Sequence, residues 1–244
     1  MLSKQNIKFI SSLRYSKYRL KYNCFVVEGP HLVDEFINSD YKIHSIFSTD
    51  KGFTYNQNEN VTFITKAELK RISYLKNPSN VLAVVYRKKT HFDIDQFVHH
   101  EQIVLLDSIS DPGNMGSMIR TADWFGLQSL YLSKECVDVY NPKVVQSTMG
   151  SLSRVSIHII DLKILIKKMK QQGIICCGAT LLGESIYKLK IKNNYAIIFG
   201  NESHGISLEI KKLLDKEILI PTKNKQIDSL NVAVSFGIIL SEFR

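Results

Sequence analysis

Apolar residues along the first part of the chain fall into short runs separated by segments with helical spacing. Four of these runs have strand length: NCFVVEG, KIHSIFS, VTFIT and VLAVVYRK. The intervening periodicity predicts helices at about 4–14, 30–38 and 66–73. The pattern is typical of a small alternating α/β domain.

The second part of the chain alternates more regularly. Its apolar runs each lead to a turn and a helical pattern: QIVLLD, SLYLS, VSIHII, GIICCGAT, YAIIFG and EILIP. Near-continuous apolar strands with helices between them predict a parallel sheet covered on both faces. The polar segment RKKTHFDIDQFVHH between the two parts predicts a linker, so we expect domains at residues 1–95 and 96–244. His99 and His100 fit a solvated loop better than a metal site, because other ligands are missing.

Polar loops follow three strands of the second part: DSISDPGNMG, GNESHG and PTKNKQIDSLN. Ligand-binding loops of parallel sheets lie at the carboxyl ends of the strands, so these loops are predicted to meet and form a site. In the first loop, Gly113 and Gly116 permit close backbone approach, and Asn114 can both donate and accept hydrogen bonds. Arg120 lies on the helix that follows, where its charge is suited to bind an anion. The alternative is a simple turn followed by a surface arginine, which has the same sequence pattern.

Composition places the chain among globular proteins, with 244 residues, 44% hydrophobic and 23% charged. No apolar run has the length of a membrane helix, and the N-terminus lacks the apolar core of a signal peptide, so we expect a cytoplasmic protein with no membrane partner. The four cysteines lack the spacing of a zinc site or a disulfide framework, which predicts reduced thiols and no bound metal.

A net charge of +9 favours a polyanionic partner. The first 22 residues hold no acidic residue and a series of basic ones: Lys4, Lys8, Arg14, Lys17, Arg19 and Lys21. Three tyrosines are interleaved with them: Tyr15, Tyr18 and Tyr22. Cations for phosphates and rings for bases predict an RNA-binding surface, and a solvated basic helix is the alternative.

The sequence lacks GxGxxG, GxxxxGK[ST] and GxSxG, which argues against the usual dinucleotide-binding, P-loop and hydrolase sites. Instead, DxxxDPxNxGxxxRTAxxFG at 107–126, FGNESHG at 199–205 and IPTKNKQIDSLNVAVSFGI at 220–238 resemble motifs 1, 2 and 3 of the SpoU/TrmH branch of the SPOUT methyltransferases, in the same order. FVVEGPHLVDEF and NPSNVLAVVYRK are similar to the substrate-binding domain often fused to that family, which resembles RNA-binding ribosomal proteins.

This resemblance implies an S-adenosylmethionine-dependent enzyme that methylates a ribose 2′-hydroxyl in structured RNA, with no DNA partner. It implies a C-terminal trefoil knot in the parallel sheet, despite the general rarity of knots, and a homodimer whose active sites use both subunits. The catalytic residues carried over by motif are Asn114, Arg120, Glu202, Ser229 and Asn231. The cofactor is expected against backbone groups of Gly200, Ile220 and Leu230.

Each of these side chains has an expected role. Arginine has a pKa of about 12 or above, so we expect Arg120 to be a permanent cation that orients phosphate and hydroxyl, although the family proposal makes it a base. Glu202 is expected to accept a hydrogen bond or a proton, while Asn114, Ser229 and Asn231 hold the loops and the RNA. Ser229 and Asn231 equally fit the cap of a helix at 229–243.

The fused N-terminal domain and the lack of a C-terminal extension favour ribosomal RNA over tRNA as the substrate. Ser203 and Ala233 replace a glycine and a serine that are frequent in the family, which leaves loop geometry and substrate choice open. The alternatives are a tRNA ribose methyltransferase and a catalytically silent RNA-binding or ribosome-assembly protein. A silent protein would be expected to have lost Asn114, Arg120 or Glu202, and all are present.

Overall fold

The computed structural model describes residues 2–53, 61–88, 102–189, 194–224 and 226–243. Packing divides them into two units. One takes the described part of residues 1–89 together with the segment 138–154, and the other takes the described part of residues 90–137 and 155–244. The expected domain boundary after residue 95, and the neighbouring pair His99 and His100, fall outside the described residues. That boundary therefore stays a prediction.

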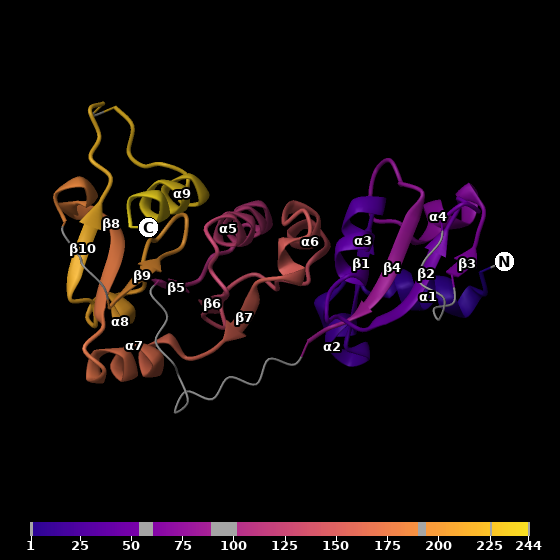
Figure 1. Ribbon diagram of the computed structural model, residues 1–244, viewed down its shortest axis with the longest axis horizontal. Helices are drawn as coiled ribbons and strands as arrows, with labels where there is room; N and C mark the ends of the chain where they lie inside the picture. The colour runs from indigo at the N-terminus through magenta and orange to yellow at the C-terminus, as the bar shows by residue number, and fades with distance from the viewer. Residues whose placement is uncertain (1, 54–60, 89–101, 190–193, 225, 244) are drawn as a thin grey trace. The chain divides into compact units, whose positions relative to one another are not determined.

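The first unit is built on a four-stranded sheet with the order β1-β4-β2-β3 (Figure 1). Strands β1 and β2 both pair antiparallel with β4, and β3 runs parallel to β2. Its elements are α1 (Lys4–Ser12), α2 (Ser16–Tyr22), β1 (Cys24–Glu28), α3 (Pro30–Ile37), β2 (Ile43–Ser48), β3 (Val61–Phe63), α4 (Lys66–Ile72), β4 (Val81–Tyr86), α6 (Pro142–Ser147) and the 3-10 helix η2 (Ser151–Ser153).

The predicted strands and helices of this unit are present, with one difference. The helix expected at 4–14 ends at Ser12, and a second helix, α2, follows after a turn and ends where Asn23 adopts a left-handed backbone with φ of 52°. Helices α1 and α4 pack against the sheet through Ile10, Leu69 and Ile72, which join one apolar core with residues of β1 and β4. The two short helices thus present their remaining faces to solvent.

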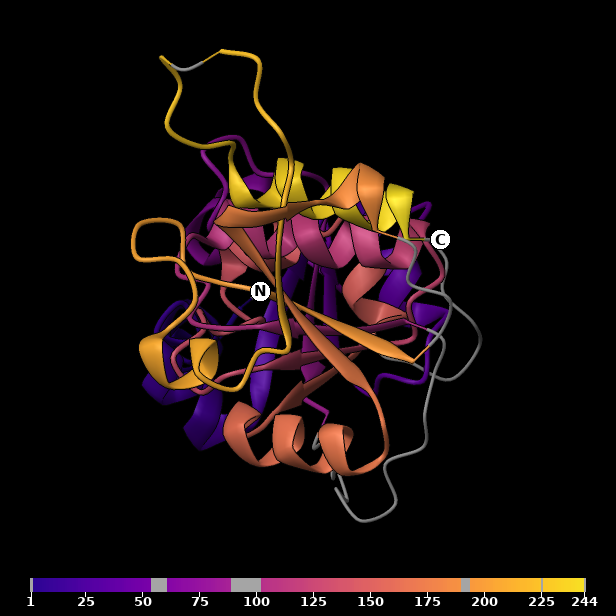
Figure 2. The ribbon, with the colours of Figure 1, turned by 90° about the vertical axis from the view of Figure 1, so that its left-hand side faces the viewer.

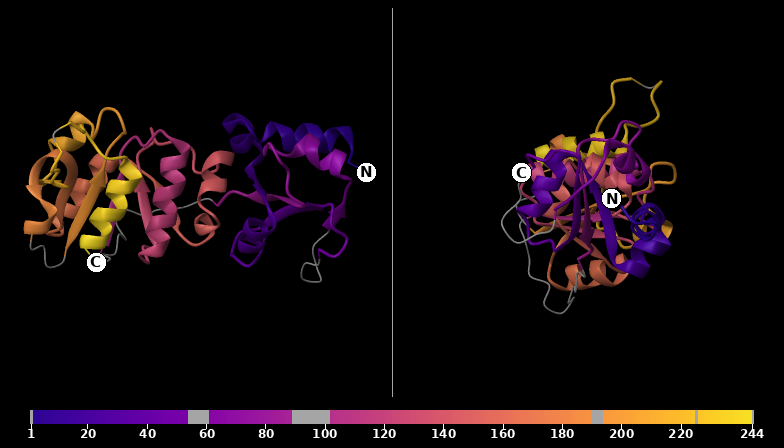
Figure 3. Two further views of the ribbon diagram at one scale, coloured as in Figure 1. Left: turned by 90° about the horizontal axis from the view of Figure 1, so that it is seen from above. Right: turned by 90° about the vertical axis from the view of Figure 1, so that its right-hand side faces the viewer.

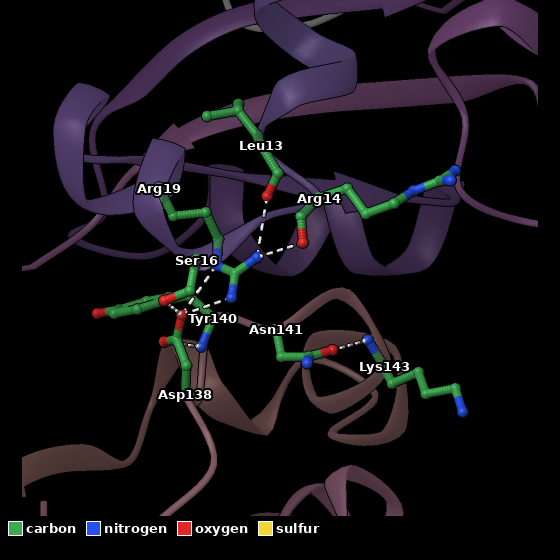
Figure 4. A network of polar contacts seen from close by, with 8 residues as sticks. All are labelled: Leu13, Arg14, Ser16, Arg19, Asp138, Tyr140, Asn141 and Lys143. Atoms are coloured by element: carbon green, nitrogen blue, oxygen red, sulfur yellow. Dashed lines mark hydrogen bonds and ion pairs between the residues drawn. The ribbon is translucent and has the colours of Figure 1, made fainter.

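A buried ion pair joins the segment 138–154 to α2 (Figure 4). The Arg19 side chain is 3% exposed, and its Nε and Nη2 donate to Asp138 Oδ2 at 2.9 and 2.7 Å. Its Nη1 donates to the carbonyl oxygens of Leu13 and Arg14 at 3.0 and 2.7 Å. Because every guanidinium nitrogen has a partner, the buried charge is compensated. Arg19 therefore has a structural role and is not one of the surface cations that the sequence predicted for RNA binding.

The second unit is a six-stranded sheet with the order β10-β8-β9-β5-β6-β7, and every strand pair is parallel. Its elements are β5 (Gln102–Leu106), α5 (Pro112–Trp124), β6 (Ser129–Leu132), β7 (Ser156–Ile159), α7 (Leu162–Gln171), β8 (Ile175–Ser185), η3 (Ile186–Lys188), β9 (Tyr195–Phe199), α8 (Leu208–Lys211), β10 (Lys216–Leu219) and α9 (Val232–Glu242). The parallel sheet predicted from the apolar runs is confirmed.

Helices cover both faces of this sheet (Figures 1 and 2). Helices α5 and α9 lie side by side on one face, as the view from above also shows (Figure 3), and α7 and α8 lie on the other. Strand β9 is buried along its whole length, which explains why its sequence, YAIIF, is uniformly apolar. The C-terminal trefoil knot stays a prediction.

The strand register brings the ends of the central strands level. Leu106 of β5 pairs with Phe199 of β9 and with Leu132 of β6, so the loops after β5 and β9 leave the sheet next to each other. At the far edge, Leu219 of β10 pairs with Ser185 of β8 after an irregularity in the register. Among the described residues, no helix combines the length and apolar character needed to cross a bilayer.

Replacing Asp138 by alanine is expected to destabilise the first unit by about 3–5 kcal/mol, because it leaves the buried Arg19 guanidinium without a counter-ion. The matched control is Lys163→Ala, which breaks an exposed ion pair with Glu209 and should cost little. Hydrogen exchange in α2 and urea unfolding measure the effect. Unchanged exchange protection in α2 of the Asp138→Ala chain would contradict the role of this pair.

Candidate active site

The loop after β5 leads directly into α5. Asp111 caps that helix, because its Oδ1 accepts a hydrogen bond from the Asn114 backbone N–H at 2.8 Å, and Pro112 occupies the first turn. Ser108 has a positive φ of 61°, which non-glycine residues seldom adopt. Its N–H donates to Ser133 Oγ at 3.0 Å, and this hydrogen bond stabilises the unusual backbone conformation of the loop.

The loop after β9 is closed by backbone hydrogen bonds. Asn201 and Gly205 exchange two N–H to carbonyl bonds, each 2.9 Å long. A Cβ atom on Gly200 would lie 2.2 Å from the carbonyl carbon of Gly205, so only glycine fits there. Asn201 Oδ1 also accepts from the N–H groups of Ser203 and His204 at 2.9 and 3.2 Å. The result is a tight turn that carries Glu202 at its tip.

The Glu202 carboxylate joins this turn to the start of α5. Oε1 accepts hydrogen bonds from the Asp111 backbone N–H and from Asn114 Nδ2, both at 3.0 Å. Oε2 accepts from the Ser110 N–H and hydroxyl at 3.2 and 3.0 Å. A second connection runs from Asn201 Nδ2 to the Ser108 carbonyl at 2.7 Å. Motif 1 and motif 2 are thus held together by side chains at the carboxyl edge of the sheet.

These hydrogen bonds control the ionisation of Glu202. Partial burial by itself would raise the pKa of its carboxyl, but the hydrogen bonds from Asn114, from its own backbone N–H, and from Asp111 and Ser110 outweigh burial and lower the pKa to about 2. The group is a carboxylate at neutral pH and a weak base. Of the two roles expected for Glu202, this environment favours the hydrogen-bond acceptor over the proton acceptor.

Motif 3 joins the same network through Asn231. Its Oδ1 accepts from the N–H groups of Ala233 and Val234, and its Nδ2 donates to Asn114 Oδ1 at 2.9 Å. Asn231 therefore caps α9 and contacts motif 1 with one side chain. The helix expected at 229–243 begins at Val232, because this cap fixes its first turn.

Two of the expected catalytic residues lie outside the network. Arg120 on α5 and Ser229 before α9 are exposed, and neither side chain forms a hydrogen bond or ion pair with any residue that the structure describes. Their side chains are therefore available to a bound molecule. Asn114, Glu202 and Asn231 are brought together, whereas Arg120 and Ser229 are not held by them.

Two of the three expected cofactor residues directly follow strand ends at this edge of the sheet, and the third lies before α9. Gly200 comes directly after β9, Ile220 after β10, and Leu230 precedes the cap of α9. The described residues 220–224 and 226–231 between β10 and α9 project from the sheet (Figure 2), and the side chains of Ile227 and Leu230 are 56% and 48% exposed. The backbone of Leu230 makes no hydrogen bond with other described residues. Accessible apolar side chains and free backbone groups fit the adenosine part of the cofactor.

Sequence reasoning missed the residues that shape the two loops. Asp107 is buried, and its Oδ2 accepts from the Ser207 N–H at 2.8 Å, which fixes the end of the motif 2 loop. Ser110 and Asn201 support Glu202 and each other. All three stand within the quoted motifs, and an asparagine in a short turn between two glycines is a recognisable signal for side-chain to backbone bonding. Among the described residues, no cluster of His, Cys, Asp or Glu is arranged to hold a metal ion.

Comparisons with known proteins agree with this arrangement. A family model described as the SpoU rRNA Methylase family matches residues 101–241, and one described as an MRM3-like substrate binding domain matches residues 4–83. The chain is 28% identical to the 23S rRNA (guanosine(2553)-2'-O)-methyltransferase RlmP of Bacillus subtilis, over 98% of this chain and 96% of that protein. The resemblance drawn from the three motifs is confirmed.

Two solved structures resemble the whole chain. A TrmH-family protein from Porphyromonas gingivalis has a TM-score of 0.90 and 34% identity, covering 100% of this chain and 98% of that one. An AdoMet-bound rRNA methyltransferase from Sinorhizobium meliloti has a TM-score of 0.87 and 25% identity, covering 100% of this chain and 96% of that one.

The Glu202 carboxylate should make stability depend on pH. Its pKa in the folded chain is about 2, below the ordinary value of 4.5, so its contribution is present above pH 4.5 and is lost as the pH falls towards 2. Carboxyl NMR of the wild type should show Glu202 titrating near pH 2, and Asn114→Ala should move that pKa upward by removing one hydrogen bond. A Glu202 resonance that titrates at 4.5 in both chains would refute the network.

Proposed function

Because this chain belongs to the SpoU rRNA Methylase family, we propose that it transfers the methyl group of S-adenosylmethionine to a ribose 2′-hydroxyl in ribosomal RNA. The observation that carries the proposal is the hydrogen-bonded connection of Glu202, Asn114 and Asn231, which assembles the three motifs at one edge of the parallel sheet. The Bacillus subtilis relative, named as a 23S rRNA 2'-O-methyltransferase, aligns with both parts of this chain, which supports rRNA over tRNA.

Arg120 is assigned the binding and orientation of the RNA. Its guanidinium is exposed, keeps its positive charge and offers a planar fork of donors that matches a phosphate. A phosphate held in this way fixes the neighbouring ribose, and alignment of reacting groups supplies up to about 7–11 kcal/mol in favourable cases. Arg120 therefore acts as a cation rather than as the base.

Asn114 and Glu202 are assigned to positioning. Glu202 accepts from both the side chain of Asn114 and the backbone of the motif 1 loop, and the second amide atom of Asn114 is bound by Asn231. This fixes the orientation of the Asn114 amide and the start of the helix that carries Arg120. Ser229, exposed two residues before Asn231, is assigned a hydrogen bond to the RNA.

Gly200, Ile220 and Leu230 would hold the cofactor. When bound, S-adenosylmethionine supplies a methyl group that its sulfonium makes electrophilic. The Gly200 turn leaves no room for a side chain. Leu230 offers an apolar side chain and a backbone that has no hydrogen-bond partner among the described residues, which suits a flat nucleoside. The chain's own contribution is to fix the position of the accepting ribose relative to this group.

A homodimer through α5 and α9 is the second part of this proposal. Trp124 at the end of α5 is 86% exposed and Val234 on α9 is 52% exposed, and the two helices lie side by side. Large exposed apolar side chains on adjacent helices mark an interaction surface. The family resemblance implies that both subunits contribute to each active site. Dimerisation through this surface would therefore serve the reaction.

Replacing Arg120 by alanine is expected to lower methyl transfer by about 10²- to 10³-fold, because a charge that positions the substrate is removed. Cofactor affinity by calorimetry and the melting temperature should stay unchanged. The matched control is Arg71→Ala, an exposed arginine on α4 of the first unit. The measurement maps 2′-O-methylation across rRNA and tRNA in a host that lacks the gene and carries each variant.

The expected outcome is one missing rRNA mark that the wild type and Arg71→Ala restore and Arg120→Ala does not. Loss of a 2′-O-methyl group in tRNA instead would identify tRNA as the substrate. Loss of no mark, with normal RNA binding, would support the silent RNA-binding alternative. Full restoration by Arg120→Ala would contradict the role of the arginine.

For the homodimer, Trp124→Asp is expected to convert a dimer into a monomer, because it places a charge in an apolar interface. Leu208→Asp is the matched control: Leu208 is 76% exposed on α8, on the opposite face of the sheet. Sedimentation equilibrium of the three chains measures the mass. A wild-type monomer, or dissociation by both variants, would speak against the proposed surface.

A further inference from the structure

Five aromatic rings of the first unit form one continuous series. Tyr18 stacks on Tyr22 with centroids 6.2 Å apart, and Tyr22 meets Phe9 edge to face at 5.1 Å. Phe9 lies 5.3 Å from His44, and His44 lies 5.4 Å from Tyr86. The series runs from α2 over α1 to β2 and β4, so it links residues that are far apart in the sequence.

Local structure explains why these rings meet. Tyr18 and Tyr22 are four residues apart on α2 and therefore share one face of the helix. The Tyr86 N–H donates to the carbonyl of Lys42 at 2.9 Å, which places the end of β4 beside the start of β2 and its His44. Phe9 packs against the core of the unit and anchors the middle of the series.

The rings on both sides of Phe9 in the series are exposed to solvent. Tyr22 and Tyr86 are each 39% exposed, although large aromatic side chains are mostly covered in folded proteins. A core packing role explains Phe9 but leaves the exposure of these two tyrosines unexplained. Side chains of this size on a surface indicate a binding function.

Positive charges accompany the rings. The ammonium groups of Lys17 and Lys21 lie 5.0 and 5.5 Å from the centroids of Tyr18 and Tyr22. Lys8 precedes Phe9, Lys42 lies two residues before His44, and both are exposed. The first 22 residues contain no acidic side chain that would neutralise this face. Rings for bases and cations for phosphates occur here side by side.

We propose that the series Tyr18, Tyr22, Phe9, His44 and Tyr86, here named the aromatic track, binds unpaired nucleotides of the substrate RNA. The inference rests on the proposed function and specifies its substrate. Bases in a duplex are stacked on each other and do not offer their faces to a protein, whereas unpaired bases stack on aromatic side chains whatever their identity. The substrate is therefore an RNA with a single-stranded segment that the first unit holds.

The test uses the full chain and two labelled probes: a single-stranded 12-nucleotide RNA and a duplex of the same sequence. Fluorescence anisotropy measures the dissociation constants of wild type, Tyr22→Leu, Tyr86→Leu and Phe63→Leu. Leucine keeps apolar bulk and removes the ring. Phe63 on β3 is 46% exposed in the same unit and lies outside the aromatic track, so it is the matched control.

Tyr22→Leu and Tyr86→Leu should each weaken single-strand binding by about fivefold to a hundredfold, from a stacking contribution of about 1–3 kcal/mol per base. Duplex binding should change by less than about twofold, since it depends on charge. Phe63→Leu should leave both unchanged. Unaltered single-strand affinity in both track variants, or equal losses for single strand and duplex, would overturn the proposal.

A second measurement covers the case in which a variant fails to fold. Photocrosslinking of the wild-type chain to single-stranded RNA carrying 5-iodouridine should label the peptides that contain Tyr22 or Tyr86. Labelling confined to other peptides would reject the aromatic track without any substitution.

Methyl transfer to rRNA separates this proposal from the proposed function. The track variants are expected to raise KM for RNA and to keep kcat within about twofold, because the rings bind rather than react. If the chain methylates no RNA but the track variants still lose single-strand binding, the proposed function fails and the aromatic track stands. If methylation is confirmed and single-strand binding is unaltered, the aromatic track alone fails.

Discussion

The arrangement of the active site depends on one carboxylate. Glu202 accepts hydrogen bonds from the backbone of Ser110 and Asp111 and from the side chain of Asn114, and so connects two loops that are about ninety residues apart in the chain. Charge-assisted bonds of this kind are stronger than neutral ones, and several on one group lower its pKa and keep it ionised. The same bonds that organise the loops therefore make Glu202 a poor base, which separates positioning from proton transfer in this site.

The carboxylate can act in this way because of the strand register. Leu106 and Phe199 end level in neighbouring parallel strands, so the two loops begin at the same height. The Gly200 turn then approaches the Gly205 backbone so closely that no side chain fits, and this returns Glu202 towards α5. Asn231 adds the third loop with the side chain that also caps α9. The same hydrogen bonds thus stabilise the fold and arrange the site. A substitution of the α9 cap, Asn231, therefore also removes the hydrogen bond to Asn114.

Much of this architecture could be predicted from the sequence because it follows from local patterns. Apolar runs such as YAIIF predicted the buried parallel strands correctly. The loops DSISDPGNMG and GNESHG were also correctly predicted to lie at one edge of the sheet. The break between α1 and α2 was missed, since the turn at residues 13–15 interrupts a continuous basic pattern. The packing of residues 138–154 with the first unit was missed as well, because contacts between segments far apart in the chain, such as the Arg19–Asp138 ion pair and the Phe25–Tyr140 ring contact, leave no local pattern.

The basic N-terminal segment shows why sequence alone could not assign its surface. Arg19 and Lys21 are two residues apart in the same helix and carry the same charge. Arg19 is buried against Asp138, whereas Lys21 lies over the Tyr22 ring and is exposed. Charge counts treat them alike, but only Lys21 adds positive charge to the surface of the proposed aromatic track. The aromatic rings show the same limit, since His44 and Tyr86 join Tyr22 only through strand pairing. Buried Arg19 fixes α2 in place through Asp138, and α2 carries Tyr18 and Tyr22 of the proposed aromatic track together with Lys17 and Lys21. The structural cation therefore orders the part of the proposed track that lies on α2.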